Sequence, residues 1–154
     1  MRYFYTCILP EKLINKHNLS NAACNFSFNL MSGEGFDRTF SVMGTNHDGK
    51  MEQEAFEDTR FKLIFSSRLR NMGRLGIFCA TILEQWKVFR KIQKGSCVWF
   101  YNLDILGVFL YAFLRAFKPS VKINIIVLDF TPSKSRFSLP SLCLHLINKA
   151  DGNI

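Results

Sequence analysis

Residues 97–130 read CVWFYNLDILGVFLYAFLRAFKPSVKINIIVLDF. Strand patterns over Cys97–Tyr101 and Val121–Phe130 enclose an apolar stretch, Ile105–Phe117, whose length predicts a buried helix. The second strand pattern is almost continuous in β-branched residues, which is typical of a parallel strand covered on both faces. A strand, helix and strand in this order predict a parallel sheet with helices on its faces.

The same alternation extends in both directions from this segment. Further strands are expected over Tyr3–Leu9, Thr39–Met43 and Phe61–Ser66, and further helices over Ser20–Ser32, Gly73–Gln93 and Leu139–Ala150. The pattern predicts a Rossmann-like, doubly wound α/β fold in which residues 1–154 form a single domain. Residues 149–154 resemble a helix end turning into a new strand, so we expect the chain to be the first half of a larger protein.

The helix expected over Gly73–Gln93 has an apolar stripe. Its members recur at helical spacing and are expected to face the core: Leu75, Phe78, Cys79, Ile82, Trp86 and Phe89.

The charge of the chain is unevenly distributed. Residues 1–61 hold six Lys/Arg and eight Asp/Glu, whereas residues 62–154 hold fourteen Lys/Arg and four Asp/Glu. A basic half of this kind favours anionic partners such as phosphates, nucleic acid or an anionic membrane surface.

The cysteines and the apolar runs indicate a cytoplasmic location. The five cysteines include no C-x-x-C pair, and we expect reduced thiols packed as small apolar side chains. No secretory signal is visible, and the longest apolar run, Ile105–Leu114, is about half of what a membrane span needs.

In open α/β sheets ligands bind beyond the carboxyl ends of the strands, and polar residues mark several of these ends. Asp129, which ends a buried strand, is the strongest candidate for a catalytic base or an acceptor-orienting group; the alternative is that it caps the turn after it. The other candidate substrate-binding residues are His17, Asn21, Asn102 and Thr131.

Two sequence signatures that would define other functions are absent. There is no G-x-G-x-x-G after the first strand, which argues against an NAD-dependent dehydrogenase. There is no D-x-D, so nothing indicates a metal-held sugar nucleotide, and we expect no metal site.

A basic edge follows the apolar stripe of the long helix. Lys87, Arg90, Lys91 and Lys94 lie beside Trp86, a combination that suits an anionic membrane surface. The alternative is a solvated helix end whose cations interact favourably with the helix dipole. Nucleic acid is not expected as a partner, because the aromatic residues follow core periodicity.

Four segments together resemble one enzyme family. They are Ser20–Leu30, Ser96–Leu103, Val121–Asp129 and Ile147–Ile154, the last with its step from a helix through Ala-Asp into a strand. These segments resemble the N-terminal domain of bacterial glycosyltransferases of the two-Rossmann-domain (GT-B) type, family four.

The resemblance implies that two domains bind different substrates. The N-terminal domain binds a glycan or lipid-linked acceptor, and a C-terminal domain binds the nucleotide-sugar donor and carries glutamates spaced by seven residues. This chain ends before such a motif, so a nucleotide sugar is expected to need the C-terminal domain, and this domain alone is expected to be inactive. The resemblance further implies sugar transfer without bound metal. We expect the enzyme to act in surface polysaccharide or lipid-linked glycan synthesis at the inner face of the cell membrane, and the basic, aromatic-edged helix is the reason for expecting the membrane. The glycine-rich first loop of many members has no match here.

Two other functions remain open. One is a non-enzymatic α/β binding module that is complete at this length. The other is a small nucleotide-dependent enzyme of doubly wound type, which the absent glycine-rich loop disfavours.

Overall fold

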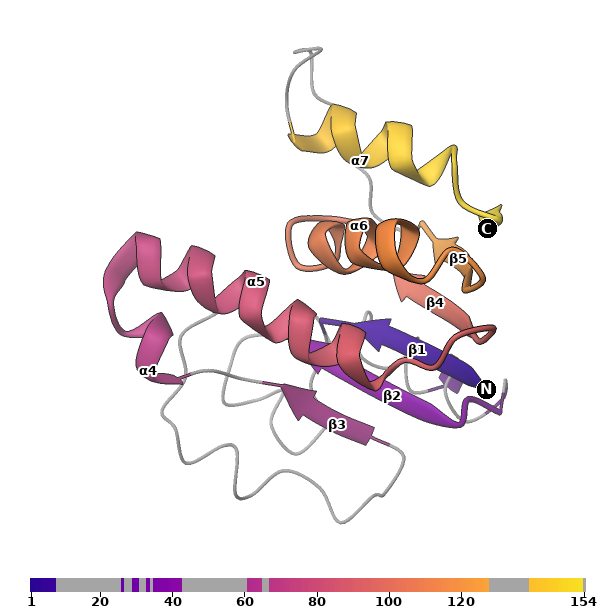
Figure 1. The fold of residues 1–154 in the computed structure, drawn as a ribbon, viewed down its shortest axis with the longest axis horizontal. Helices are drawn as coiled ribbons and strands as arrows, with labels where there is room; N and C mark the ends of the chain where they lie inside the picture. Colours follow the sequence, from indigo (N-terminus) through magenta and orange to yellow (C-terminus); the bar gives the residue numbers. More distant parts are fainter. Residues whose placement is uncertain are drawn as a thin grey trace.

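The computed structural model describes residues 1–7, 26, 29–30, 33, 35–42, 61–64, 67–127 and 139–153. Its elements, in chain order, are shown in Figure 1. They are β1 (Arg2–Thr6), β2 (Arg38–Val42), β3 (Phe61–Ile64), α4 (Ser67–Arg70), α5 (Gly73–Lys91), β4 (Cys97–Tyr101), α6 (Val108–Phe117), β5 (Lys122–Ile126), α7 (Leu139–Ile147) and β6 (Gly152–Asn153).

The strands form one six-stranded sheet in the order β3-β2-β1-β4-β5-β6. Every neighbouring pair is parallel; Tyr5, for example, lies opposite Phe40 of β2 and Phe100 of β4. This is the strand order of doubly wound, Rossmann-type sheets. The fold class predicted from the sequence is therefore confirmed.

Helices α5, α6 and α7 cover one face of the sheet. Side chains alternate along a strand, so Tyr3 and Tyr5 of β1 point to this face together with Val98 and Phe100 of β4. They pack with Val88 of α5, Leu110 and Leu114 of α6, and Ile147 of α7, all of which are buried. This is the larger of the two cores.

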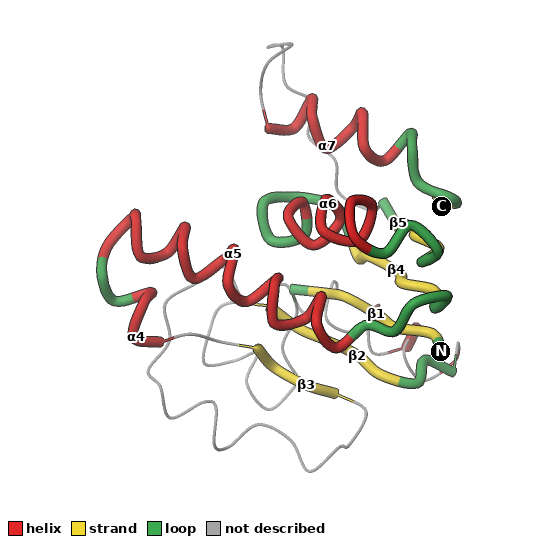
Figure 2. Tube along the Cα trace, in the orientation of Figure 1, coloured by secondary structure: helices red, strands yellow, loops and turns green. Residues whose placement is uncertain are grey.

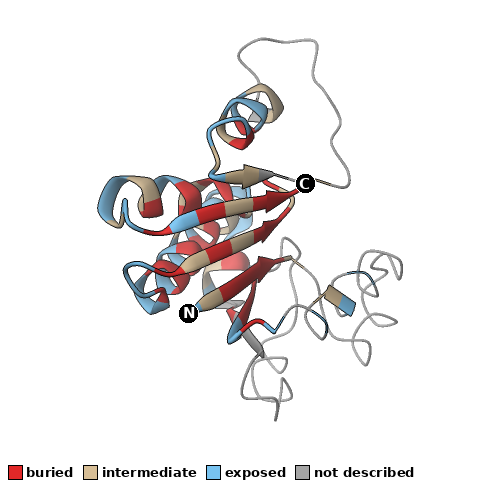
Figure 3. Ribbon diagram, turned by 90° about the vertical axis from the view of Figure 1, so that its right-hand side faces the viewer, coloured by how far each residue is buried: buried red, intermediate tan, exposed pale blue. Residues whose placement is uncertain are grey.

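A second, smaller core lies on the opposite face of the sheet. Phe4 stacks on Phe36 with ring centroids 5.0 Å apart, and Tyr101 and Ile126 join them. Leu30, whose backbone is helical, packs against this cluster, so helical chain is present on this face too. Figure 3 shows the buried strands with helices on one side of the sheet.

The long helix α5 is turned the opposite way from the prediction. Its buried residues are Gly76, Ala80, Thr81, Glu84, Gln85, Val88 and Phe89. Of the predicted core stripe only Phe89 is buried, Ile82 is half-buried, and Leu75, Phe78, Cys79 and Trp86 are exposed.

The physical reason for this orientation is that the inward polar side chains have partners. Arg70 of α4 donates from Nε and Nη2 to the two carboxylate oxygens of Glu84, at 3.1 and 2.5 Å, and both side chains are fully buried. A buried charge is tolerable only when it is paired and hydrogen-bonded, and this pair meets both conditions.

Short helix α4 was not among the elements predicted from the sequence. Figure 2 shows it joined to α5 by a tight turn. The two helices approach so closely that a Cβ on Gly76 would lie 2.0 Å from the backbone oxygen of Leu69. Glycine is therefore required at this position of α5.

The cysteine prediction is only partly correct. Among the described cysteines Cys143 is buried, Cys7 and Cys97 are half-buried and Cys79 is exposed, and all four are free thiols. Cys79 is exposed because it belongs to the side of α5 that faces away from the sheet.

Candidate functional site

The direction of winding reverses between β1 and β4. From β1 the chain continues to β2 on one side, whereas β4 continues to β5 on the other. Ligands of doubly wound sheets bind at such a switch point, beyond the carboxyl ends of the two strands. The residues that follow these ends are Cys7 after β1 and Asn102 after β4.

Asn102 has an unusual backbone conformation. Its φ is 53°, and it is the only non-glycine residue with positive φ among those the structure describes. Asparagine tolerates this left-handed region better than most residues. The Asn102 N–H donates to the backbone oxygen of Ile126 at 2.8 Å, which fixes the turn against β5. Asn102 therefore lies at the carboxyl edge, as the sequence predicted.

Asp104 organises the loop between β4 and α6. Its carboxylate Oδ1 accepts from the Leu106 N–H at 2.8 Å, and its backbone oxygen accepts from Gly107 and Val108 at 3.0 and 2.8 Å. Partial removal of water from the carboxyl group raises the pKa of Asp104 above its ordinary value, although the hydrogen bond from the Leu106 N–H acts to lower it. The helix after this strand was predicted to begin at Ile105, but α6 begins at Val108.

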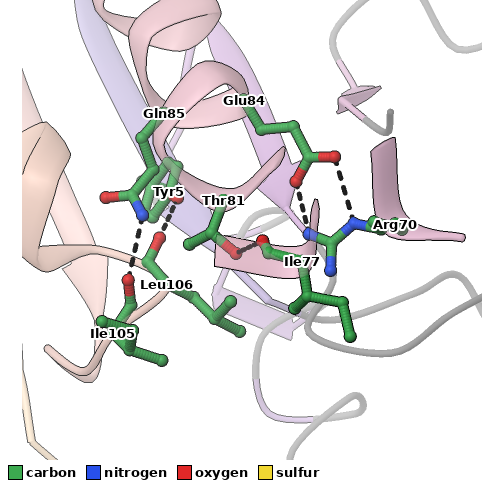
Figure 4. A network of polar contacts seen from close by, with 8 residues as sticks. All are labelled: Tyr5, Arg70, Ile77, Thr81, Glu84, Gln85, Ile105 and Leu106. Carbon is green, nitrogen blue, oxygen red and sulfur yellow. Dashed lines mark hydrogen bonds and ion pairs between the residues drawn. The ribbon is translucent and has the colours of Figure 1, made fainter. Parts of the chain in front are cut away.

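Two buried side chains, Tyr5 of β1 and Gln85 of α5, hold this loop in place (Figure 4). The Tyr5 hydroxyl donates to the backbone oxygen of Leu106. Gln85 of α5 donates from Nε2 to the Ile105 oxygen at 2.9 Å and accepts the Leu110 N–H on Oε1 at 2.8 Å. The loop is therefore bonded to β1 through Tyr5 and to α5 through Gln85, and the first turn of α6 is bonded to α5 through the same Gln85 side chain.

Tyr5 is kept neutral by its surroundings. Burial raises the pKa of Tyr5 well above its ordinary value, and the carboxylate of Asp104 raises it further. The phenol therefore acts as a hydrogen-bond donor to Leu106 rather than as a base. Together with Gln85, it makes the β4 side of the switch point a fixed, hydrogen-bonded edge.

The predicted site residues fall into three groups. His17, Asn21, Asp129 and Thr131 lie outside the described residues, so their roles stay predictions. Asn102 lies at the carboxyl edge. The predicted membrane-surface residues lie elsewhere: Trp86, Lys87, Arg90 and Lys91 are exposed on α5, and Lys94 is exposed just after it.

The basic residues do not border the switch point. Only residues 92–96 separate the end of α5 from the first residue of β4. The basic end of α5 is therefore near the amino edge of the sheet, opposite to the edge that carries Asn102.

Sequence reasoning missed Tyr5, Arg70, Glu84 and Gln85. A signal was present: Thr81, Glu84, Gln85 and Val88 recur at helical spacing on the side of α5 opposite to the apolar stripe. Its meaning depends on Arg70 and the β4–α6 loop, which are distant in sequence.

Two further properties bear on ligands and location. Within the described ranges, no three His, Cys, Asp or Glu side chains come close enough together to hold a metal ion. None of the helices that the structure describes combines the length and the apolar character needed to cross a membrane.

Comparison with protein-family models and with curated proteins finds no match to this sequence.

Proposed function

We propose that this domain is the acceptor-binding domain of a glycosyltransferase that moves a sugar from a nucleotide-sugar donor to a glycan or lipid-linked acceptor in surface polysaccharide synthesis. The observation that carries the proposal is the sheet order β3-β2-β1-β4-β5-β6, with a switch point between β1 and β4. Enzymes of the two-Rossmann-domain type are built on sheets of this kind. Since fold alone does not fix function, the proposal also depends on the four segments that resemble that family.

The carboxyl edge suits the uncharged, hydroxyl-rich sugar of an acceptor. Asn102 has an amide side chain, which can both donate to and accept from a sugar hydroxyl. The turn that carries it is fixed by the Ile126 hydrogen bond, and the next loop is fixed by Tyr5 and Gln85. Pre-ordered polar groups of this kind lower the entropy cost of binding.

The donor is assigned to a second domain, so the test measures binding rather than transfer. The chain is labelled with nitrogen-15 and titrated with a short-chain polyprenyl-phosphate-linked sugar and, separately, with UDP-glucose. The acceptor mimic should shift the amide signals of Cys7 and Asn102 and bind at least about tenfold more tightly than UDP-glucose. Asn102→Ala should weaken this binding, whereas the control Gln93→Ala, at an exposed position near the amino edge, should not.

A nucleotide-binding enzyme is the second candidate, because the strand order is also that of dinucleotide-binding domains. Tighter binding of UDP-glucose than of the acceptor mimic, with shifts at Cys7 and Asn102, would favour this candidate and refute the acceptor assignment. A titration in which neither ligand moves the carboxyl edge would refute both and leave the non-enzymatic binding module.

A further inference from the structure

Two neighbouring helices turn apolar sides away from the sheet. On α5, Leu75 is 80% exposed, Phe78 47% and Trp86 39%. On α6, Ala112 and Ala116 are exposed, and Phe117 is 62% exposed. We call these six residues the outer apolar face. Large apolar surfaces of this kind usually mark an interaction site.

Aromatic contacts join the two helices into one surface. Phe78 of α5 meets Phe109 of α6 edge-on at 5.8 Å, and Trp86 meets Phe113 in the same way at 5.2 Å. Phe117 packs edge-on against Phe89 at 6.1 Å. The outer apolar face is therefore continuous across the boundary between α5 and α6.

Positive charge borders this face. The segment 67–127 holds ten Lys/Arg but only two acidic residues, Glu84 and Asp104. Glu84 is buried against Arg70, and Asp104 lies in the loop before α6. The C-terminal part of α5 instead exposes Lys87, Arg90 and Lys91, followed by Lys94. Neither α5 nor α6 has an exposed acidic residue.

The basic residues beside the outer apolar face decide whether a second copy of the chain or a lipid surface fits it better. A second copy of the chain, docked through the same face, would bring two basic borders together, which is unfavourable in a desolvated contact. An anionic lipid surface supplies the opposite charge and also accepts apolar side chains at the level of its headgroups. Tryptophan and phenylalanine are well suited to that depth.

We infer that the outer apolar face of α5 and α6, together with Arg90, Lys91 and Lys94, docks the domain on an anionic membrane surface. The inference is independent of the proposed reaction, since it concerns the outward sides of α5 and α6 and not the switch point. It differs from the sequence expectation, in which the apolar stripe faced the core and only Trp86 and the basic residues beside it met the membrane.

The test is co-sedimentation of the full chain with vesicles of phosphatidylcholine containing about 30% phosphatidylglycerol, and with vesicles of phosphatidylcholine alone. Binding should be strong to the anionic vesicles and weak to the neutral ones. Each Lys or Arg near the surface strengthens partitioning by about fivefold, so Arg90→Gln/Lys91→Gln/Lys94→Gln should weaken it by about 100-fold.

A matched control removes the same charge elsewhere. Arg38→Gln/Lys122→Gln/Lys149→Gln alters three exposed cations that do not belong to α5 and should weaken partitioning much less than the α5 triple variant. Equal losses in the two triple variants would show net charge rather than this face to be responsible, and would overturn the inference.

A second pair of measurements tests the apolar part. Leu75→Ser/Phe117→Ser changes two exposed side chains, should leave circular dichroism unchanged and should weaken partitioning by about tenfold or more. In a Trp99→Phe background, the fluorescence of Trp86 should shift to shorter wavelength on vesicles and be quenched by brominated lipid.

Two further results would overturn the inference. One is equal binding to neutral and anionic vesicles, or no binding to either. The other is a dimer in sedimentation velocity that Leu75→Ser/Phe117→Ser converts to a monomer while vesicle binding stays unchanged, because the face would then join two copies of the chain.

Discussion

The buried ion pair between Arg70 and Glu84 makes a quantitative prediction about stability. Replacing Glu84 by leucine leaves the Arg70 guanidinium buried without its carboxylate partner. Breaking a buried pair from one side costs about 3–5 kcal/mol, a large share of the roughly 5–15 kcal/mol that stabilises a domain of ordinary size. With a slope of about 2 kcal/mol per molar urea, the unfolding midpoint of Glu84→Leu should fall by about 1.5–2.5 M.

The double variant separates a requirement for the charges from a requirement for the space they fill. In Arg70→Met/Glu84→Leu both charges are gone and apolar groups of similar length replace them, so stability should return to within about 1 kcal/mol of the parent chain. Urea unfolding followed by far-ultraviolet circular dichroism gives the four free energies of the double-mutant cycle. The control Arg68→Met, an exposed cation on the same helix, should change stability by less than about 0.5 kcal/mol.

The reasoning would be refuted by a loss of less than about 1 kcal/mol in Glu84→Leu, or by a double variant whose loss equals the sum of the two single losses. Either result would mean that α5 keeps its polar side inward for a reason other than this pair.

Three further predictions concern backbone and charge. Gly76→Ala should destabilise the chain by about 3 kcal/mol, because the new methyl group would lie 2.0 Å from the Leu69 oxygen; a gain of about 1 kcal/mol in urea unfolding, as helix propensity alone would give, would contradict this. Asn102→Ala should be less stable than Asn102→Gly by about 1 kcal/mol, because φ is 53° at this position; equal midpoints for the two variants would contradict it. Asp151 is expected to stabilise the fold above its ordinary pKa of 3.8: partial burial acts to raise its pKa, but hydrogen bonds from the Ile123 N–H and Arg115 hold the folded value lower. That contribution to the free energy of unfolding, under about 1 kcal/mol at this exposed site, should be lost as pH falls through the folded pKa. Asp151→Asn should therefore flatten the acid side of a plot of stability against pH. An unchanged slope would argue against this.

The strands were predictable because their signal is local. Val98 and Phe100, or Ile123 and Ile125, point to one covered face, and neighbours such as Tyr101 and Ile126 point to the other. Burial on both faces leaves β-branched and aromatic residues in nearly every strand position. The strand order was not predicted, because alternating strands and helices with right-handed connections are compatible with more than one doubly wound order.

The orientation of α5 was not predictable in the same way, because a hydrophobic stripe shows where apolar residues lie and not which side has partners. Glu84 becomes a core residue only through Arg70, and Gln85 only through backbone groups of Ile105 and Leu110. Such pairings depend on tertiary structure, which composition and periodicity do not contain. Of the candidate site, only Asn102 is placed by the structure, at the sheet edge where the strand-end rule puts it.

The double hydrogen bond of Gln85 connects the two regions for which functions are proposed. The Gln85 amide, on the inner side of α5, bonds to Ile105 in the loop after Asn102 and to Leu110 in the first turn of α6. If binding at the outer apolar face moves α5, the segment from Ile105 to Leu110 must move with it, or the two hydrogen bonds of Gln85 are lost. We expect occupancy of either region to change the affinity of the other, and thermodynamic linkage requires that change to be the same in both directions.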